Sequence, residues 1–128
     1  MQNGAMTDVT TVLIVDDSRV SRMMIRSMIL AKHPDWVMEE AVSGEEALEK
    51  IRTIIPHLIT LDINMPGMGG LAAADVLVKE CPGVCIVLLT GNIQESSRRK
   101  AGQLGIGFVE KPITESCVAN VLAYMENK

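Results

Sequence analysis

The chain has 128 residues, of which 48% are hydrophobic and 22% are charged, and its formal net charge is −4. This composition fits one soluble globular domain and leaves no room for a second. The negative charge argues against a nucleic-acid-binding surface, which needs clustered basic residues. No apolar run approaches the roughly 20 residues that cross a bilayer, so we expect no membrane segment.

The ends and the cysteines indicate a cytoplasmic protein. The N-terminal stretch MQNGAMTDV lacks the basic and apolar layout of a signal peptide. Cys81, Cys85 and Cys117 are odd in number and have no second ligand pair nearby, which is typical of reduced thiols that fill a core. We expect a single domain over residues 10–127, a flexible N-terminus at 1–9 and frayed ends at 126–128.

The first strand is predicted over residues 11–15, where the run TVLIV is short, apolar and β-branched. A helix follows, and Pro34 is expected to stop it. Residues at helical spacing share one face of this helix, which we expect to pack in the core: Val20, Met23, Met24, Ser27, Met28 and Ala31.

Strands over 36–41 and 57–61 are each followed by a helix. The first of these helices begins with a capping box formed by Ser43 and Glu46, and Pro56 is expected to end it. The second runs from about residue 70 to residue 80. Its apolar positions recur at helical spacing and include Leu71, Ala74, Leu77 and Val78.

The last two strands are predicted over 85–89 and 107–109. The helix between them is expected to begin after Asn92, with Glu95 three residues later, and to stop at Gly105. The final helix follows Pro112, with Thr114 as its cap. Its apolar stripe comprises Val118, Val121, Leu122 and Met125.

This alternation predicts an α/β fold, a doubly wound (βα)5 flavodoxin-like sandwich. The strands read as continuous hydrophobic runs, which is typical of a parallel sheet covered on both faces. In such sheets ligands bind beyond the carboxyl ends of the strands. Asp16 and Asp17 follow the first strand, Asp62 the third, Thr90 the fourth and Lys111 the fifth, so all five are expected at one edge.

Three carboxylates at one edge require cations. Two unit charges ~4 Å apart repel by about 4 kcal/mol at an effective dielectric constant near 20. Lys111 supplies one positive charge, which is not enough. Mg²⁺ is the best supplement, because it binds through one or two carboxylates, keeps waters and leaves room for phosphate. The sequence therefore predicts a magnesium site built for a phosphoryl group.

Four motifs, LIVDDSR, LDINMPGMGGL, LLTGN and FVEKPI, resemble the receiver domain of bacterial two-component response regulators. The resemblance covers about residues 10–127 and is nearest to the stand-alone, CheY-like type. It implies a parallel sheet with the strand order 2-1-3-4-5. It also implies a phosphorylation-activated switch that catalyses only its own phosphorylation and dephosphorylation, and is otherwise not an enzyme.

The resemblance implies a role for each motif residue. Asp62 is the phospho-acceptor, which takes its phosphoryl group from a histidine kinase. Asp16 and Asp17 bind Mg²⁺ together with Asp62 and the backbone carbonyl of Asn64. Lys111 pairs with Asp62 and then with a phosphoryl oxygen.

The remaining implied roles concern output. Thr90 hydrogen-bonds the phosphoryl group, Phe108 is the aromatic switch that turns inward, and the peptide bond before Pro112 is cis. The output face consists of the fourth helix, the fifth strand and the fifth helix. Its partner is an unknown protein, for which a flagellar motor switch in chemotaxis is one example, and the lone domain favours a monomer.

The chain departs from the family pattern at two places. Gly69 replaces the acid that commonly precedes the third helix, and as an N-cap it costs a few tenths of a kcal/mol. Phe108 stands where a tyrosine would offer a hydroxyl. Asn64 and Asn92 occupy positions that tune dephosphorylation in the family.

Two other functions are compatible with parts of this pattern. A magnesium-dependent phosphohydrolase of the haloacid dehalogenase type would also use Asp62, but it needs a second acid where Asn64 stands. A phosphate-independent interaction domain could share the fold, but it has no need of the complete acid, hydroxyl and lysine set. The run Arg98, Arg99 and Lys100 is interpreted as a solvated helix face in preference to a docking patch.

Overall fold

The structure is a computed structural model that describes residues 9–126. Within these residues, five parallel strands form one sheet in the order β2-β1-β3-β4-β5, which confirms the predicted order and fold class. The strands are β1 (Thr11–Val15), β2 (Val37–Ala41), β3 (Leu58–Asp62), β4 (Cys85–Thr90) and β5 (Gly107–Glu110). The expected flexible segment and frayed end fall largely on residues 1–8 and 127–128, which lie outside the described part.

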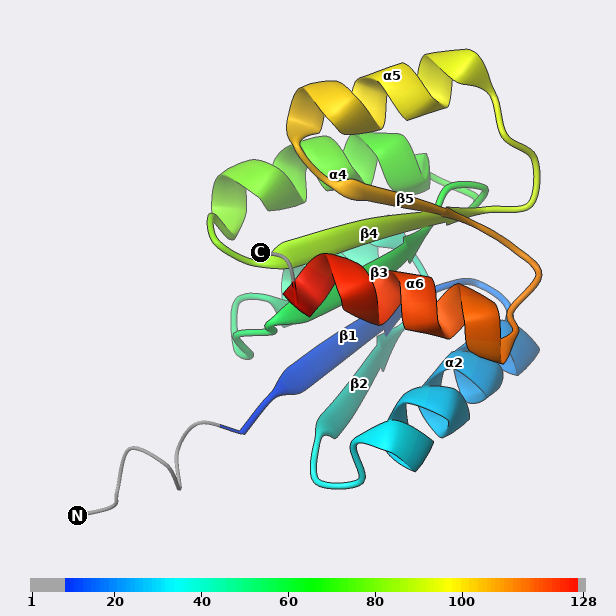
Figure 1. Ribbon diagram of the computed structural model, residues 1–128. Helices are drawn as coiled ribbons and strands as arrows, with labels where there is room; N and C mark the ends of the chain where they lie inside the picture. The colour runs from blue at the N-terminus through cyan, green and yellow to red at the C-terminus, as the bar shows by residue number, and fades with distance from the viewer. Residues whose placement is uncertain (1–8, 127–128) are drawn as a thin grey trace.

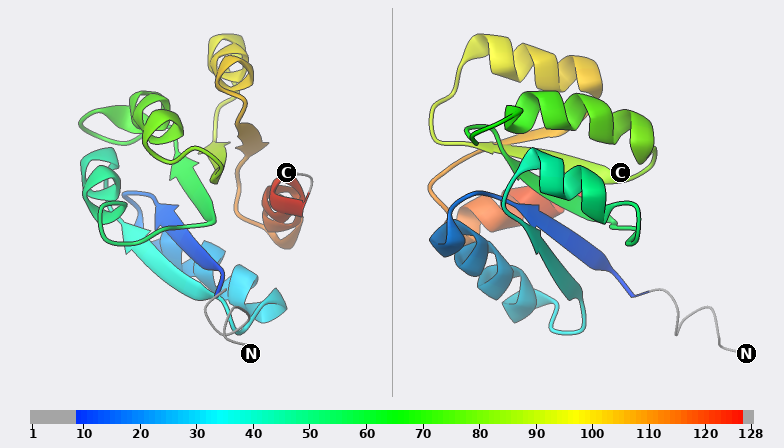
Figure 2. Two further views of the ribbon diagram at one scale, coloured as in Figure 1. Left: turned by 90° about the vertical axis from the view of Figure 1, so that its left-hand side faces the viewer. Right: turned by 180° about the vertical axis from the view of Figure 1, so that it is seen from behind.

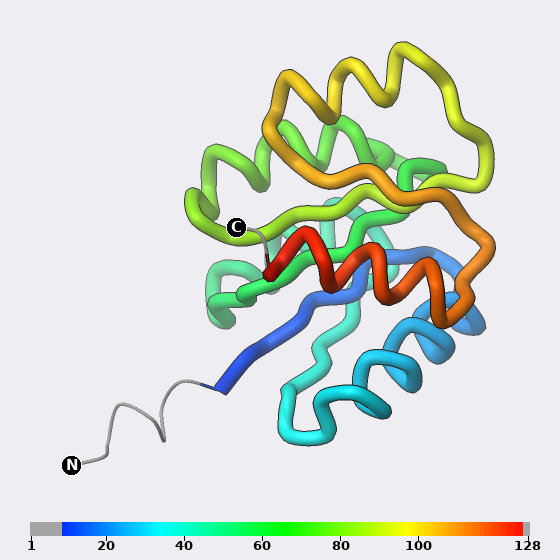
Figure 3. Tube along the Cα trace, viewed as in Figure 1, coloured from blue at the N-terminus to red at the C-terminus, as the bar shows by residue number. Residues whose placement is uncertain are grey.

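Helices cover both faces of the sheet (Figures 1 and 2). One face carries α2 (Arg19–Lys32) and α6 (Glu115–Glu126). The other carries α3 (Gly44–Lys50), α4 (Gly69–Glu80) and α5 (Glu95–Leu104). Figure 3 follows the chain from β1 out to the edge strand β2 and back to β3, which pairs with the opposite side of β1. The carboxyl ends of β1 and β3 are therefore neighbours.

The alternation of side chains along each strand divides the core into two layers. Val12 and Ile14 of β1 face α2 and α6, whereas Leu13 and Val15 face the other three helices. Cys85 and Cys117 are buried in the first layer, as expected for core cysteines, whereas Cys81 is only partly buried. No helix among residues 9–126 is long and apolar enough to span a membrane.

The predicted core face of α2 is wrong except at Met28, which is partly buried against the core. Ile25 and Ile29 are the buried residues of this helix. Val20 and Met23 instead lie on its outer surface, with 65% and 56% of their area exposed. The helix carries apolar residues on two faces, so spacing alone does not decide which of them meets the sheet.

Helix ends agree with the sequence where a side chain caps them. Ser43 Oγ accepts a hydrogen bond from the Glu46 amide at 3.0 Å, and Thr114 Oγ1 accepts one from the Cys117 amide at 3.1 Å. Gly105 ends α5 with φ of 72°, a left-handed conformation that glycine adopts at low cost. Helix α2 ends at Lys32, just before Pro34.

Three predicted boundaries are corrected. Helix α3 ends at Lys50, well before Pro56, since its C-cap Ile51 already closes the last turn. Helix α5 begins at Glu95 with Gln94 as its N-cap, and Asn92 lies in a turn in which its backbone contacts Thr90. Gly69 is not the N-cap of α4. Met68 holds that position, and Gly69 follows it with φ of 75°, a conformation in which a side chain would be strained.

Candidate functional site

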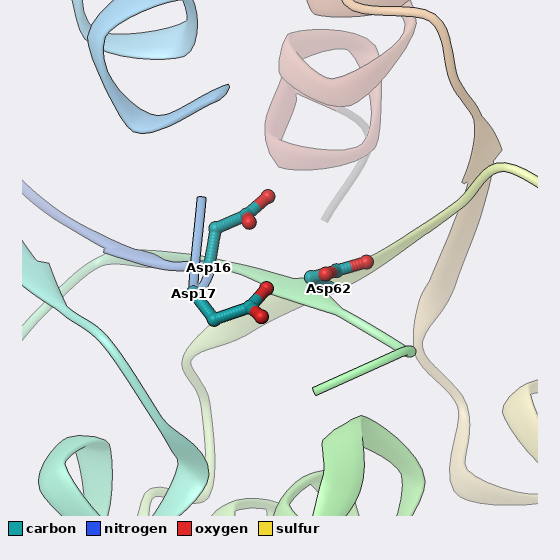
Figure 4. A group of neighbouring side chains, drawn as sticks. All are labelled: Asp16, Asp17 and Asp62. Atoms are coloured by element: carbon teal, nitrogen blue, oxygen red, sulfur yellow. The ribbon is translucent and has the colours of Figure 1, made fainter. Parts of the chain in front are cut away.

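Three carboxylates gather at the ends of β1 and β3 (Figure 4). Asp16 and Asp17 directly follow β1, and Asp62 is the last residue of β3. One ligand atom from each lies within 4.8 Å of the other two. Asp16 and Asp62 are buried, while Asp17 is exposed. The prediction that these acids converge is therefore met by the geometry.

The sheet edge is built so that helices approach the acids closely. Ser18 caps α2, since its hydroxyl accepts the Ser21 amide at 3.2 Å, and the Ser18 amide donates to Asp16 Oδ1 at 2.8 Å. At the start of α4, a Cβ on Gly70 would lie 2.2 Å from the backbone oxygen of Asp62. Only glycine at this position lets α4 begin so near the end of β3.

Lys111 lies between two of the carboxylates. Its Nζ is 3.2 Å from Asp16 Oδ2 and 3.4 Å from Asp62 Oδ1. The Lys111 amide donates to the Thr90 carbonyl at 2.7 Å, and the Lys111–Pro112 peptide bond is cis, as the resemblance implies. Burial alone would lower the pKa of Lys111, but the two carboxylates outweigh it, so the pKa is raised and the ammonium stays charged.

The negative charge of Asp62 is only partly compensated by its neighbours. Burial raises the pKa of its carboxyl group, and the nearby Asp16 carboxylate raises it further. Lys111 and the Asn64 amide, which is 3.4 Å from Asp62 Oδ1, lower it without cancelling the rise. A clustered set of carboxylates with this residual repulsion fits a hard divalent cation such as Mg²⁺.

The structure places the other predicted residues around this cluster. Thr90 ends β4, the strand next to Asp62, and its side chain is buried. Its hydroxyl donates to the Asn92 carbonyl at 2.9 Å and accepts from the Asn92 amide at 3.1 Å. Asn64 is exposed in the loop after β3. The metal, phosphoryl and switch roles of these residues stay predictions.

Phe108 lies half-buried on β5, at a groove of about 600 Å³ between α5 and α6. The guanidinium carbon of Arg98 is 5.4 Å from the centre of the Phe108 ring. The Tyr124 hydroxyl, on α6, lies 3.5 Å from the Phe108 carbonyl oxygen. Arg98, interpreted from the sequence as part of a solvated face, therefore also covers an aromatic ring.

Two side chains near the site, Arg22 and Glu45, make polar contacts that were not predicted. Arg22 of α2 donates to the Asp16 backbone oxygen at 2.7 Å and pairs with Glu40 of β2 at 2.8 Å. Glu45 of α3 accepts the Met68 amide at 3.2 Å, where α4 has no side-chain cap of its own. A signal for Arg22 is present in the sequence, because it shares a helical face with Ile25 and Ile29. A charge on a buried face needs a partner.

Comparison with known proteins agrees with this geometry. The model of the family described as response regulator receiver domain matches residues 12–123. The chain is 36% identical to the chemotaxis protein CheY of Thermotoga maritima over 112 residues, which is 87% of this chain and 92% of that protein. It is 41% identical over 104 residues to a protein-glutamate methylesterase/protein-glutamine glutaminase of Archaeoglobus fulgidus. That match covers 79% of this chain but 29% of the relative, so the chain spans less than a third of the methylesterase.

Solved structures show the same architecture. The chemotaxis protein CheY4 of Vibrio cholerae superposes with a TM-score of 0.80 at 25% identity, covering 91% of this chain and 98% of that one. A CheY-like receiver domain protein of Methanospirillum hungatei has a TM-score of 0.84 at 20% identity, covering 94% and 96%, which supports the fold alone. The chain belongs to the response regulator receiver domain family, whose members are phosphorylation-activated modules of two-component signalling.

Proposed function

We propose that Asp62 is the phospho-acceptor of this receiver domain and that a histidine kinase is the donor. The observation that carries the proposal is the position of the Lys111 ammonium between the buried carboxylates of Asp16 and Asp62. This arrangement keeps a nucleophilic carboxylate beside a fixed positive charge, which can then meet an incoming phosphoryl oxygen.

Asp16, Asp17 and Asp62, with the backbone carbonyl of Asn64, would hold Mg²⁺. When bound, Mg²⁺ neutralises negative charge on the phosphoryl oxygens. An oxygen of Asp62 attacks phosphorus while the bond from phosphorus to the histidine nitrogen breaks, and that nitrogen keeps the electron pair. The product is an acyl phosphate on Asp62, and Lys111 remains charged beside it.

The signal would pass from Asp62 to the face formed by α5, β5 and α6. The phosphoryl group offers a stronger acceptor to the Thr90 hydroxyl than the Asn92 carbonyl that it now contacts. Movement of Thr90 would draw Phe108 inward and reshape the groove beside it. Because relatives are chemotaxis proteins, a flagellar switch protein is one candidate partner for a monomer acting in the cytoplasm.

Incubation with acetyl phosphate tests this function without knowledge of the kinase. We expect intact-mass spectrometry to show one phosphoryl group on the wild type with Mg²⁺ and none with EDTA. Asp62→Asn should abolish the adduct, while Asp75→Asn, on the exposed side of α4, should leave it unchanged. An adduct that persists in Asp62→Asn would contradict the proposal. Turnover of unrelated phosphomonoesters would instead indicate a hydrolase.

A further inference from the structure

Arg22 connects the acidic loop to the body of the protein. It is the fourth residue of α2, and only 12% of its side chain is exposed. Its Nε is 2.8 Å from Glu40 Oε1 on β2, and its Nη1 donates to the backbone oxygen of Asp16 at 2.7 Å. One planar guanidinium therefore joins a helix, a strand and the peptide between the two acids.

The contact with the Asp16 carbonyl has a specific consequence for Asp17. That carbonyl belongs to the planar peptide unit that joins the two acids, so its orientation also sets the positions of the Asp17 nitrogen and Cα. The other polar groups of Asp16 are held elsewhere. Its amide donates to the Ala41 carbonyl at 3.1 Å, and its carboxylate contacts the Ser18 amide and Lys111. Arg22 thus supplies the contact that orients the peptide leading to Asp17.

Glu40 is a firm support for this arginine. Its second carboxylate oxygen lies 3.5 Å from Arg26 Nη1, one turn further along α2. Its backbone carbonyl accepts a hydrogen bond from the Lys50 ammonium. A guanidinium can donate to Glu40 and to Asp16 at once because its donors form a fixed planar fork, and a lysine ammonium has no such fork.

We propose that Arg22 is a positioning residue for the divalent cation site. It orients the Asp16–Asp17 peptide so that both carboxylates meet Asp62, without itself being a ligand. The inference rests on the proposed function, since it assumes a cation shared by these acids. Supporting groups of this kind commonly change metal affinity tenfold or more when they are removed.

The direction in which Mg²⁺ affinity changes when Arg22 is replaced distinguishes a positioning role from a purely electrostatic one. Removing a positive charge near the carboxylates should strengthen cation binding if charge alone matters. Removing an orienting contact should weaken it. Arg22→Met removes both the charge and the contacts, whereas Arg22→Lys keeps the charge and loses the fork.

The experiment is a Mg²⁺ titration of the full chain, measured by isothermal calorimetry. Urea unfolding of each variant checks that it is folded. We expect Arg22→Met and Arg22→Lys to weaken Mg²⁺ binding by about tenfold. Arg26→Met is the matched control, because Arg26 is half-exposed and pairs with the same Glu40, and its binding should stay within about twofold of the wild type. Glu40→Gln, which keeps Arg22 but weakens its support, should lower affinity several-fold and serves where Arg22→Met does not fold.

Equal or tighter Mg²⁺ binding by folded Arg22→Met, or equal loss in Arg26→Met, would overturn this inference. The acetyl phosphate reaction distinguishes its failure from that of the proposed function. If the wild type binds Mg²⁺ and is phosphorylated while the Arg22 variants match it, only the positioning role is wrong. If the wild type binds no Mg²⁺ and takes no phosphoryl group, the proposed function fails as well.

Discussion

The Lys111 ammonium lies 3.4 Å from a carboxylate oxygen of Asp62, and the same nitrogen lies 3.2 Å from Asp16. Replacing Lys111 with Met leaves these carboxylates without their cation. Because the lysine side chain is 21% exposed, we expect a loss of about 1–3 kcal/mol in the free energy of unfolding, less than for a fully buried pair. Urea unfolding in EDTA measures it, and Mg²⁺ should restore part of the loss.

Lys79→Met is the matched control for this experiment. Lys79 pairs with Asp75 at 3.9 Å on the surface of α4, so its removal should change stability by less than about 0.5 kcal/mol. Equal losses in the two variants would show that the site lysine compensates no buried charge.

Asp62→Asn should stabilise the metal-free protein near pH 7. Burial and Asp16 raise the pKa of Asp62 in the folded state, so the ionised carboxylate opposes folding. Protonated Asp62 contributes to the free energy of unfolding at low pH, and this contribution is lost as the pH rises through the folded-state pKa. Asparagine never ionises, so the melting temperature of the variant in EDTA should exceed that of the wild type at pH 7.

The difference in melting temperature should shrink as the pH falls through the pKa of Asp62, because the wild-type carboxyl group then takes up a proton. Lys111, whose pKa is raised, stays charged throughout this range. A variant that is less stable than the wild type at pH 7 in EDTA would contradict the electrostatic interpretation.

Helix α2 offers a direct comparison of its two apolar faces. Ile29 is fully buried against the sheet, so Ile29→Ala should lower the free energy of unfolding by about 2–5 kcal/mol. Met23 lies on the outer face, and Met23→Ala should change it by no more than about 0.5 kcal/mol. Urea unfolding of both variants measures the contrast, and comparable losses would place the outer face in the core after all.

Arg98 should bias the position of Phe108. A guanidinium over an aromatic ring that solvent still reaches contributes about 0.5–1 kcal/mol, so Arg98→Gln should shift the inward population of the half-buried Phe108 ring by about two- to fivefold. The chain contains a single phenylalanine, so fluorinated or carbon-labelled phenylalanine reports Phe108 alone in NMR spectra. Arg99→Gln is the control.

Without ligands, the Phe108 chemical shift of Arg98→Gln should be closer than that of the wild type to the shift seen with beryllofluoride and Mg²⁺. Identical Phe108 shifts in wild type and Arg98→Gln, with and without beryllofluoride, would remove any role for this contact. Trp36 is a poorer reporter, because it stacks on His33 just before β2, at the opposite end of the strands from the acids.

The convergence of Asp16, Asp62 and Lys111 could be predicted because each directly ends or follows an apolar strand, and parallel strands end at one edge. Which face of α2 is buried could not, since Ile25 and Ile29 compete with an equally periodic set of methionines and valine. The buried face is decided by how α2 packs against β1, and the spacing of apolar residues carries no information about that packing.

Contacts between distant segments also escaped prediction. The support of Asp16 by Arg22 and Glu40 exists because β2 lies beside β1, and the resemblance gave the roles of motif residues without this arrangement. Helix α5 begins at Glu95, and Asn92 lies in a local turn in which its backbone contacts the Thr90 hydroxyl. Gly69 follows Met68, the N-cap of α4, and has a positive φ. The neighbouring residues in the sequence do not indicate this conformation.

A crystal structure with Mg²⁺ and beryllofluoride tests the central claim most directly. We expect beryllium bonded to an oxygen of Asp62, one magnesium ion in contact with Asp16, Asp17 and Asp62 directly or through water, and the Lys111 ammonium against a fluorine atom. Beryllofluoride bound at another residue, or a magnesium ion away from these three carboxylates, would contradict the assignment of this edge of the sheet as the phosphorylation site.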